Sequence, residues 1–211
     1  MVRVKICGIT NWADAKLAID AGADALGFNF YAKSPRRIAV SHAREIIRHM
    51  PRRVSAVGVF VDASTEDVLK IARAAKLGVL QLHGDESPRT VAQLARQFPV
   101  IKAFQVGPSF RVKELEKYPS AAAFLLDGFG GKLRGGTGRS FDWRIARQAK
   151  RFAPVILAGG LKKENATRAM RAAKPFAIDV CSGVEASPGK KDGKKVRAFM
   201  ATVKRERRKK A

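Results

Sequence analysis

The chain has 211 residues, 46% of them hydrophobic, which suits one sizeable core and is short for two ordinary domains. No run approaches the ~20 consecutive apolar residues of a membrane-spanning helix. The first residues lack the apolar stretch and cleavage site of a signal peptide, so we expect a cytoplasmic protein that does not associate with membranes. Two cysteines and three histidines are too few for a disulfide-rich scaffold or a structural zinc site, and we expect no metal.

The formal net charge is unusually high, at +24, from 42 Lys and Arg against 18 Asp and Glu. Eleven of the basic residues and two of the acidic ones lie in residues 189–211. The remaining charge is spread over the chain and does not form one basic stripe with interleaved aromatic residues. We therefore expect incidental affinity for polyanions but no specific nucleic-acid partner.

Short β-branched runs alternate with segments of helical spacing along the chain. The predicted strands are Arg3–Cys7, Ala25–Phe30, Ser55–Val61, Val79–Leu82, Val100–Phe104, Ala122–Asp127, Pro154–Ala158 and Phe176–Cys181. The predicted helices are Asn11–Ala21, Ser41–His49, Ser64–Lys76, Ser87–Phe98, Ser109–Lys117, Phe141–Phe152, Lys162–Ala173 and Gly193–Arg205. Asn11 can cap the first helix, and Gly22 can end it in the left-handed conformation.

Eight nearly apolar strands alternating with helices indicate a parallel sheet buried on both faces. They favour an α/β fold that closes as a compact, single-domain (β/α)8 or TIM barrel over residues 1–203, followed by a basic tail over 204–211 that frays. The alternative is an open doubly wound sheet. It is disfavoured because Cys7-Gly8-Ile9-Thr10 stands where its dinucleotide fingerprint would be.

Polar residues interrupt the carboxyl ends of the predicted strands, where barrel enzymes place their reacting groups. These residues are Cys7, Asn29, Asp62, Gln81, His83, Asp127 and Asp179. Any one of them could be a satisfied loop or cap residue. Because burying a polar group is costly unless it is bonded, their agreement on one rim favours a functional site there.

Two glycine pairs follow the last two predicted strands. Gly159 and Gly160 follow the seventh, whereas Ser182 and Gly183 follow the eighth. Glycines let backbone N–H groups approach an anion, and a helix amino terminus adds partial positive charge. One pair alone could merely end a strand, but two in register predict a phosphate-bearing small-molecule substrate.

A glycine-rich stretch, residues 128–138, separates the sixth strand from its helix. A flexible connector would explain it. Because the stretch follows Asp127 at the mouth, we favour a lid that excludes water.

Motifs in this order resemble one enzyme family along the chain. They are Val4-Lys5-Ile6-Cys7-Gly8-Ile9-Thr10, Gly27-Phe28-Asn29-Phe30, Lys33-Ser34-Pro35-Arg36, Gly58-Val59-Phe60-Val61, Leu80-Gln81-Leu82-His83-Gly84-Asp85-Glu86, Leu125-Leu126-Asp127, Gly135-Gly136-Thr137-Gly138, Phe141-Asp142-Trp143, Leu157-Ala158-Gly159-Gly160-Leu161 and Asp179-Val180-Cys181-Ser182-Gly183-Val184-Glu185. The sequence is similar to phosphoribosylanthranilate isomerase, from tryptophan biosynthesis. Only the residues beyond Val203 lie outside the resemblance.

The resemblance implies a cofactor-free Amadori rearrangement, an aldose-ketose isomerisation of N-(5-phosphoribosyl)anthranilate. An acid must protonate the ring oxygen and a base must remove the C2′ proton. The resemblance assigns the acid to Asp127 and the base to Cys7. Without the motif, we would interpret Cys7 as a small buried hydrophobe. The positive field of the chain and nearby backbone dipoles would favour a Cys7 thiolate.

The resemblance also implies the substrate-binding residues. Gly159, Gly160, Ser182 and Gly183 would bind the phosphate, in agreement with the backbone argument. Arg36 would meet the anthranilate by stacking on its ring and pairing with its carboxylate, although a solvated loop arginine is the alternative and Arg37 adjoins it. Asp179 would hydrogen-bond the substrate.

One residue departs from the family pattern. Related sequences usually carry serine where Cys181 stands. Strands eight and one are neighbours in a closed barrel, about 4.8 Å apart. We therefore hypothesise that Cys181 lies near Cys7 and forms an oxidative link that silences the base.

Two alternatives stay open. A sister phosphate-binding barrel, such as indole-glycerol-phosphate synthase or a pentose-phosphate epimerase, would show a catalytic lysine at a strand end or a metal-binding histidine set, and neither is evident. A polyanion-binding protein would use the barrel only as a scaffold for its charge. The oligomeric state, monomer or homodimer, is not fixed by the sequence.

Overall fold

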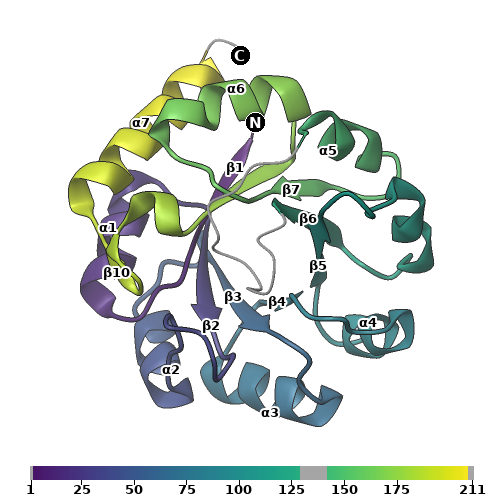
Figure 1. Cartoon of the computed structure of the whole chain (residues 1–211). Coiled ribbons are helices and arrows are strands. Elements are labelled where there is room, and N and C mark those ends of the chain that lie inside the picture. The colour runs from purple at the N-terminus through teal and green to yellow at the C-terminus, as the bar shows by residue number, and fades with distance from the viewer. Residues whose placement is uncertain (1, 129–141, 209–211) are drawn as a thin grey trace.

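In the computed structural model, which describes residues 2–128 and 142–208, eight parallel strands close into a barrel wrapped by helices (Figure 1). The strands are β1 (Arg3–Cys7), β2 (Ala25–Asn29), β3 (Ser55–Phe60), β4 (Val79–Leu82), β5 (Val100–Val106), β6 (Ala123–Gly128), β7 (Val155–Leu157) and β8 (Ala177–Val180). They pair in sequence order, and β8 closes on β1. The predicted single-domain (β/α)8 barrel is confirmed.

The helices lie on the outside of the barrel. They are α1 (Trp12–Ala21), α2 (Val40–Arg48), α3 (Thr65–Ala75), α4 (Pro88–Ala95), α5 (Arg144–Ala149), α6 (Lys163–Ala173) and α7 (Gly193–Arg208). In the described part of the chain, no helix has the length and apolar character needed to span a membrane.

The α-helix predicted over Ser109–Lys117 is wrong. The chain forms a shorter 3-10 helix, η1 (Val112–Lys117), instead. Pro108 and Pro119 bracket this segment, and a proline disfavours helical backbone in the residue before it. The turns between them are closed by hydrogen bonds between residues three apart, the 3-10 pattern. One example is the bond from the Tyr118 N–H to the Leu115 carbonyl at 3.0 Å.

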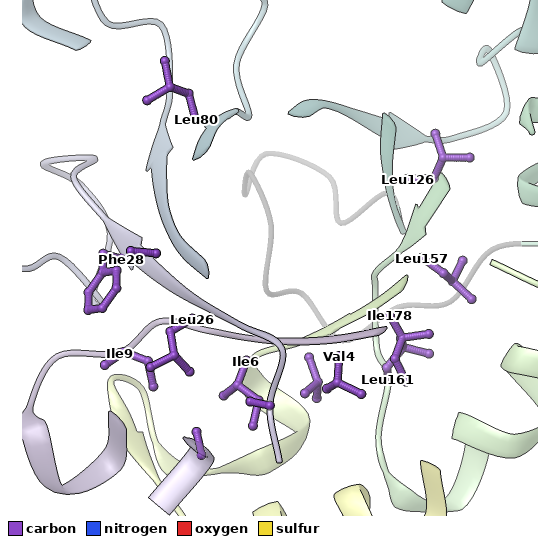
Figure 2. Close-up of a cluster of buried hydrophobic side chains, with 14 of the residues drawn as sticks. Val4, Ile6, Ile9, Leu26, Phe28, Leu80, Leu126, Leu157, Leu161 and Ile178 are labelled. Atoms are coloured by element: carbon purple, nitrogen blue, oxygen red, sulfur yellow. The ribbon is translucent and has the colours of Figure 1, made fainter. Parts of the chain in front are cut away.

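The main hydrophobic core lies between the strands and the helices. On β1, Val4 and Ile6 are fully buried on the outer face of the barrel. The side chains of Leu80, Leu126 and Leu157 likewise point outward from their strands, toward the helices (Figure 2). A second cluster, which includes Val57, Ile101, Leu125 and Ile156, fills the barrel interior. Since side chains alternate along a strand, Lys5 and Cys7 point into this interior from β1.

The ends of α1 follow the chemistry that the sequence predicted. The Asn11 side chain accepts a 2.9 Å bond from the Asp14 N–H, which satisfies a helical donor. Gly22 ends the helix at a φ of 97°, where a side chain would be strained. The amino end of α1 is therefore fixed next to the loop that leaves β1, and its carboxyl end next to the turn that leads into β2.

Helix α7 corrects the predicted basic tail. It continues past Val203 to Arg208. The Arg207 guanidinium donates to the Val2 carbonyl at 2.6 Å and to Asp24 at 2.8 Å, whereas Glu206 is buried and pairs with Arg171. Residues 204–208 are thus anchored to the amino-terminal end of the barrel, and residues 209–211 lie outside the described residues.

A small hairpin after β8 has no counterpart in the predicted elements. The 3-10 helix η2 (Ser182–Val184) leads into β9 (Glu185–Ser187), which pairs antiparallel with β10 (Lys190–Lys191). These strands are too short to show alternation in the sequence. The hairpin carries Glu185 and Lys191 to the carboxyl end of the barrel.

Candidate active site

A cavity of about 430 Å³ opens at the carboxyl end of the barrel. Its lining combines one thiol pair, two carboxyl groups, an arginine and a glycine turn. The residues that line it include Cys7, Asn29, Arg36, Gln81, His83, Asp127, Gly159, Gly160, Asp179, Cys181 and Ser182. The strand-end residues that the sequence predicted therefore share one cavity, with the exception of Asp62, which is absent from its lining.

Seven of the eight predicted site residues face this cavity, and Gly183 does not. The Cα of Gly183 packs against the Leu161 carbonyl so closely that no side chain would fit. Its glycine identity is thus explained by packing between two loops, which also brings Ser182 next to the β7 turn. Gly159 and Gly160, at φ of 86° and 61°, form that turn just before α6.

Cys7 ends β1 and is 9% exposed. The absence of a side chain on Gly27 makes room for it, because a Cβ there would lie 2.6 Å from Cys7 Sγ and 3.1 Å from Lys5 Nζ. A hydrogen bond from Cys181 and the positive charges of Lys5 and Lys191 lower the pKa of Cys7 well below its ordinary value, although burial opposes this. Specific neighbours favour the thiolate, in addition to any diffuse field.

Cys181 lies beside Cys7, as the neighbouring strands predicted. Ile6 pairs with Val180 in the register of β1 and β8, so the two cysteines follow at the same level. Both are free thiols. The hydrogen bond to Cys7, together with burial, raises the pKa of Cys181. The oxidative link itself stays a prediction.

Lys5 and Asp179 form a buried ion pair one layer below Cys7. Lys5 Nζ lies 2.9 Å from Asp179 Oδ1, and their side chains are 3% and 9% exposed. Burial raises the pKa of Asp179 to about 6 despite the attraction of Lys5. Sequence reasoning missed Lys5, although a lysine two residues before Cys7 in an otherwise apolar strand was a usable signal.

Asp127 lies on β6, three strands from β1 around the barrel, and is 4% exposed. Its Oδ2 is 3.5 Å from His83 Nε2. Gln81 Nε2 lies 2.9 Å from His83 Nδ1. If the Gln81 amide donates this bond, Nδ1 is the acceptor, and the proton of a neutral imidazole is then on Nε2, on the side of Asp127. Within the described residues, Gln81 Oε1 and His83 Nε2 are buried without a hydrogen-bond partner. These two atoms mark where the cavity can receive a polar ligand.

Arg36 reaches the cavity from the loop after β2, and its guanidinium already holds a carboxylate. Its Nε and Nη2 donate to Glu185 at 2.9 and 2.7 Å. Lys191 Nζ bonds the same Glu185 at 2.9 Å and also donates to the Cys7 carbonyl. The solvated-loop alternative for Arg36 is therefore wrong, because Glu185 fixes its orientation and leaves the other edge of the guanidinium for a ligand.

The arrangement suits acid-base chemistry on a phosphorylated molecule. A carboxyl group and a thiolate face one space from different strands, and a glycine turn with a serine borders it. Residues 2–128 and 142–208 contain no group of three His, Cys, Asp or Glu side chains that could hold a metal ion. The predicted lid, residues 128–138, lies outside the described residues after Gly128.

Comparisons with known proteins agree on one family. A family model described as N-(5'phosphoribosyl)anthranilate (PRA) isomerase matches residues 4–202. The N-(5'-phosphoribosyl)anthranilate isomerase of Geobacter metallireducens is 47% identical over 204 residues, covering 97% of this chain and 100% of its own length. The solved phosphoribosyl anthranilate isomerase of Thermus thermophilus is 42% identical with a TM-score of 0.89, covering 97% of this chain and 99% of that structure.

A third relative bears on the ligand. It is a phosphoribosyl anthranilate isomerase solved in complex with reduced 1-(o-carboxyphenylamino)-1-deoxyribulose 5-phosphate. It is 40% identical with a TM-score of 0.87, and the match covers 97% of this chain and 99% of that structure.

Proposed function

This chain belongs to the N-(5'-phosphoribosyl)anthranilate isomerase family, and we propose that it converts N-(5'-phosphoribosyl)anthranilate to 1-(2-carboxyphenylamino)-1-deoxyribulose 5-phosphate in tryptophan biosynthesis. One observation carries the proposal. A thiol with a lowered pKa and a buried carboxyl group face the same cavity beside a glycine turn suited to phosphate. The reaction moves protons within one molecule, which these groups can do without a cofactor.

Asp127 acts as the general acid. It donates a proton to the ring oxygen of the ribose, the C1′–O bond breaks, and the anthranilate nitrogen becomes an iminium. Its burial and the neighbouring His83 ring, whose Nε2 lies 3.5 Å from Asp127 Oδ2, place the carboxyl group for that step. His83 and Gln81 orient it and do not touch the reacting bond.

Cys7 acts as the general base. Its thiolate removes the C2′ proton from the iminium, giving an enolamine that tautomerises to the ketone. Desolvation strengthens this base because fewer water molecules surround it, while Lys5 and Lys191 keep it ionised. Neither proton transfer requires a metal ion.

The substrate is oriented by its two anionic ends. The phosphate lies at Gly159, Gly160 and Ser182, where backbone N–H groups and the amino terminus of α6 favour an anion. The anthranilate ring lies against Arg36, whose unpaired edge binds the carboxylate. Asp179 hydrogen-bonds the sugar between them. Gly183 contributes through packing.

The test follows the fluorescence of freshly generated N-(5'-phosphoribosyl)anthranilate with the wild-type chain, Cys7→Ser and Asp127→Asn. We expect wild-type turnover and a loss of about 10³-fold or more in kcat for each variant, since each removes one proton-transfer group. Circular dichroism establishes that both variants are folded.

Two results would contradict the proposal. A folded but inert wild-type chain would exclude the isomerase activity and leave a sister barrel or a polyanion-binding scaffold as the alternatives. Activity in both variants within tenfold of wild type would keep the isomerase and reject the assignment of acid and base. A Ser41→Ala control, on the exposed surface of α2, should leave kcat unchanged.

A further inference from the structure

Lys5 is a buried cation that the mechanism above uses only as a neighbour. It lies on β1 two residues before Cys7, so both side chains point into the barrel. Both side chains end beside Gly27, which has no Cβ. A Cβ placed on Gly27 would lie 2.6 Å from Cys7 Sγ and 3.1 Å from Lys5 Nζ. Although burial opposes it, the charges of Asp179 and Cys7 raise the pKa of Lys5.

We propose that Lys5 is a positioning residue that keeps Cys7 ionised and directed into the cavity. This inference rests on the proposed function, in which Cys7 is the base. The 2.9 Å bond to Asp179 fixes the ammonium, and the sulfur of Cys7 borders the same space beside Gly27 as the ammonium does. The bond to Asp179 therefore keeps the ammonium beside the thiolate.

Other titratable groups surround Cys7, and each has another partner. They are Lys191 of β10, Arg36 of the loop after β2, Glu185 of β9, and Asp179 and Cys181 at the end of β8. Lys191 and Arg36 both bind Glu185, which offsets their charge. Lys5 shares its charge with Asp179 in the same way, but it lies in the same inward-facing column of β1 as Cys7.

Removing Lys5 would also leave two anions together. Asp179 and Cys7 repel one another, and the repulsion contributes to the raised pKa of Asp179. Without the ammonium, this repulsion favours a proton on one of the two groups. The thiol is the weaker acid, so we expect it to take the proton.

A second buried lysine supplies a matched control. Lys102 on β5 is 2% exposed and bonds Glu86 at 2.8 Å and the Gly84 carbonyl at 2.7 Å. Its neighbours Ile101 and Ala103 point into the barrel, so Lys102 points outward. Lys102→Met removes a buried, ion-paired lysine of the same sheet without removing a charge beside Cys7.

The experiment titrates the ultraviolet absorbance of the thiolate in a Cys181→Ser background, where Cys7 is the one remaining cysteine. We expect Lys5→Met to raise the titration midpoint by about 1 to 3 pH units, the usual effect of losing a close opposite charge. Lys5→Arg should restore most of the shift, and Lys102→Met should leave the midpoint unchanged. If Lys5→Met fails to fold, Lys5→Met/Asp179→Asn removes the ion pair as a whole and should raise the midpoint by a smaller amount.

Activity supplies the second readout. In Lys5→Met, kcat/KM should fall about 10-fold or more at neutral pH and recover as the pH rises through the new midpoint. A merely structural lysine would lower kcat/KM at every pH. An unmoved midpoint in a folded variant without Lys5 would overturn the inference, whatever the activity. A shifted midpoint in a chain with no isomerase activity would support the role of Lys5 in ionising Cys7 and would contradict the proposed function instead.

Discussion

The barrel is hollowed at both ends, and the two cavities differ in chemistry. The amino-terminal cavity is the larger, at about 910 Å³ against about 430 Å³. Its lining is mostly apolar, with Phe152, Pro154, Met170 and Phe176 among it, and all but one of its charged residues are Lys or Arg. In the carboxyl-terminal cavity, carboxyl groups, thiols and cations converge on one space. Convergent polar groups, and not volume, therefore distinguish the site.

The same difference appears in what holds the residues in place. At the carboxyl end, Gly27 and Gly183 have no side chain, which lets functional groups and loops approach one another closely. At the amino end, Arg207 and Glu206 tie α7 to the strand starts. Substitutions at the carboxyl end should thus affect catalysis first, and those at the amino end should affect stability first.

Among variants that keep the proposed acid and base, the largest effect is expected for Gly27→Ala. The new Cβ would lie 2.6 Å from Cys7 Sγ, so the sulfur must move. A displacement of about 1 Å can cost about 10²-fold, and we expect kcat/KM to fall by that factor while the chain stays folded. Steady-state kinetics and thermal unfolding measure both quantities. Gly78→Ala is the matched control, because a Cβ there meets only the Ala56 carbonyl at 3.9 Å. Unchanged kinetics in Gly27→Ala would show that this close approach does not position the base.

Truncation after Val203 tests the amino-terminal end. The sequence predicted a fraying tail there, whereas the structure has Arg207 bonded to Val2 and Asp24. We expect the truncated chain to lose about 2 to 4 kcal/mol of unfolding free energy and to keep its turnover while folded. Urea denaturation measures the loss.

Two single variants of α7 separate position from charge. Arg207→Ala should cost about 1 to 2 kcal/mol, whereas Arg205→Ala, which removes an exposed charge from the same helix, should cost about 0.5 kcal/mol or less. Equal losses in the two variants would mean that net charge, and not the contacts of Arg207, stabilises this end.

Asp179 gives the carboxyl end a pH dependence of its own. Its pKa is raised from 3.8 to about 6 in the fold, so the folded state binds more protons than the unfolded state between these values. The contribution of this group to stability is therefore present below about 3.8 and is lost as the pH rises through about 6.

Asp179→Asn removes that dependence. The wild type should lose stability as the pH rises across this window, whereas the variant should not. The unfolding free energy of the variant minus that of the wild type should therefore increase by about 1 to 3 kcal/mol. Denaturation curves at a series of pH values measure the difference. A constant difference across the window would show that the burial of Asp179 is offset in full by Lys5.

The fold was largely predictable because its signals are local. Alternating strands and helices, with Asn11 and Gly22 at the ends of α1, predicted the barrel. Cys7 and Asp127 could be placed at its mouth because a polar residue at the end of an apolar strand is conspicuous. The 3-10 helix over Val112–Lys117 was missed because helical spacing does not reveal where flanking prolines shorten a segment.

The interactions inside the site were less predictable, since they join distant parts of the chain. Lys5 and Asp179 are 174 residues apart, and their pairing depends on the register of β8 against β1. Glu185 and Lys191 reach the site on a hairpin too short to show a pattern. Lys5 was also missed because it lies two residues before the end of β1, although it faces the same interior as Cys7.

The smallest effect on catalysis is expected for Phe176→Ala, in the wall of the amino-terminal cavity. The side chain is 42% exposed and stacks under the Arg3 guanidinium at 4.9 Å, so its loss should cost about 1 kcal/mol. We expect kcat/KM to stay within about twofold of wild type, because apolar side chains such as Ile156 and Leu125 are packed in the barrel interior between the two cavities. Steady-state kinetics on Phe176→Ala, beside Gly27→Ala in the same assay, compares the two ends directly. A tenfold loss of kcat/KM in Phe176→Ala would mean that packing at the strand starts controls the geometry at the strand ends, and the two ends would then have to be treated as one mechanical unit.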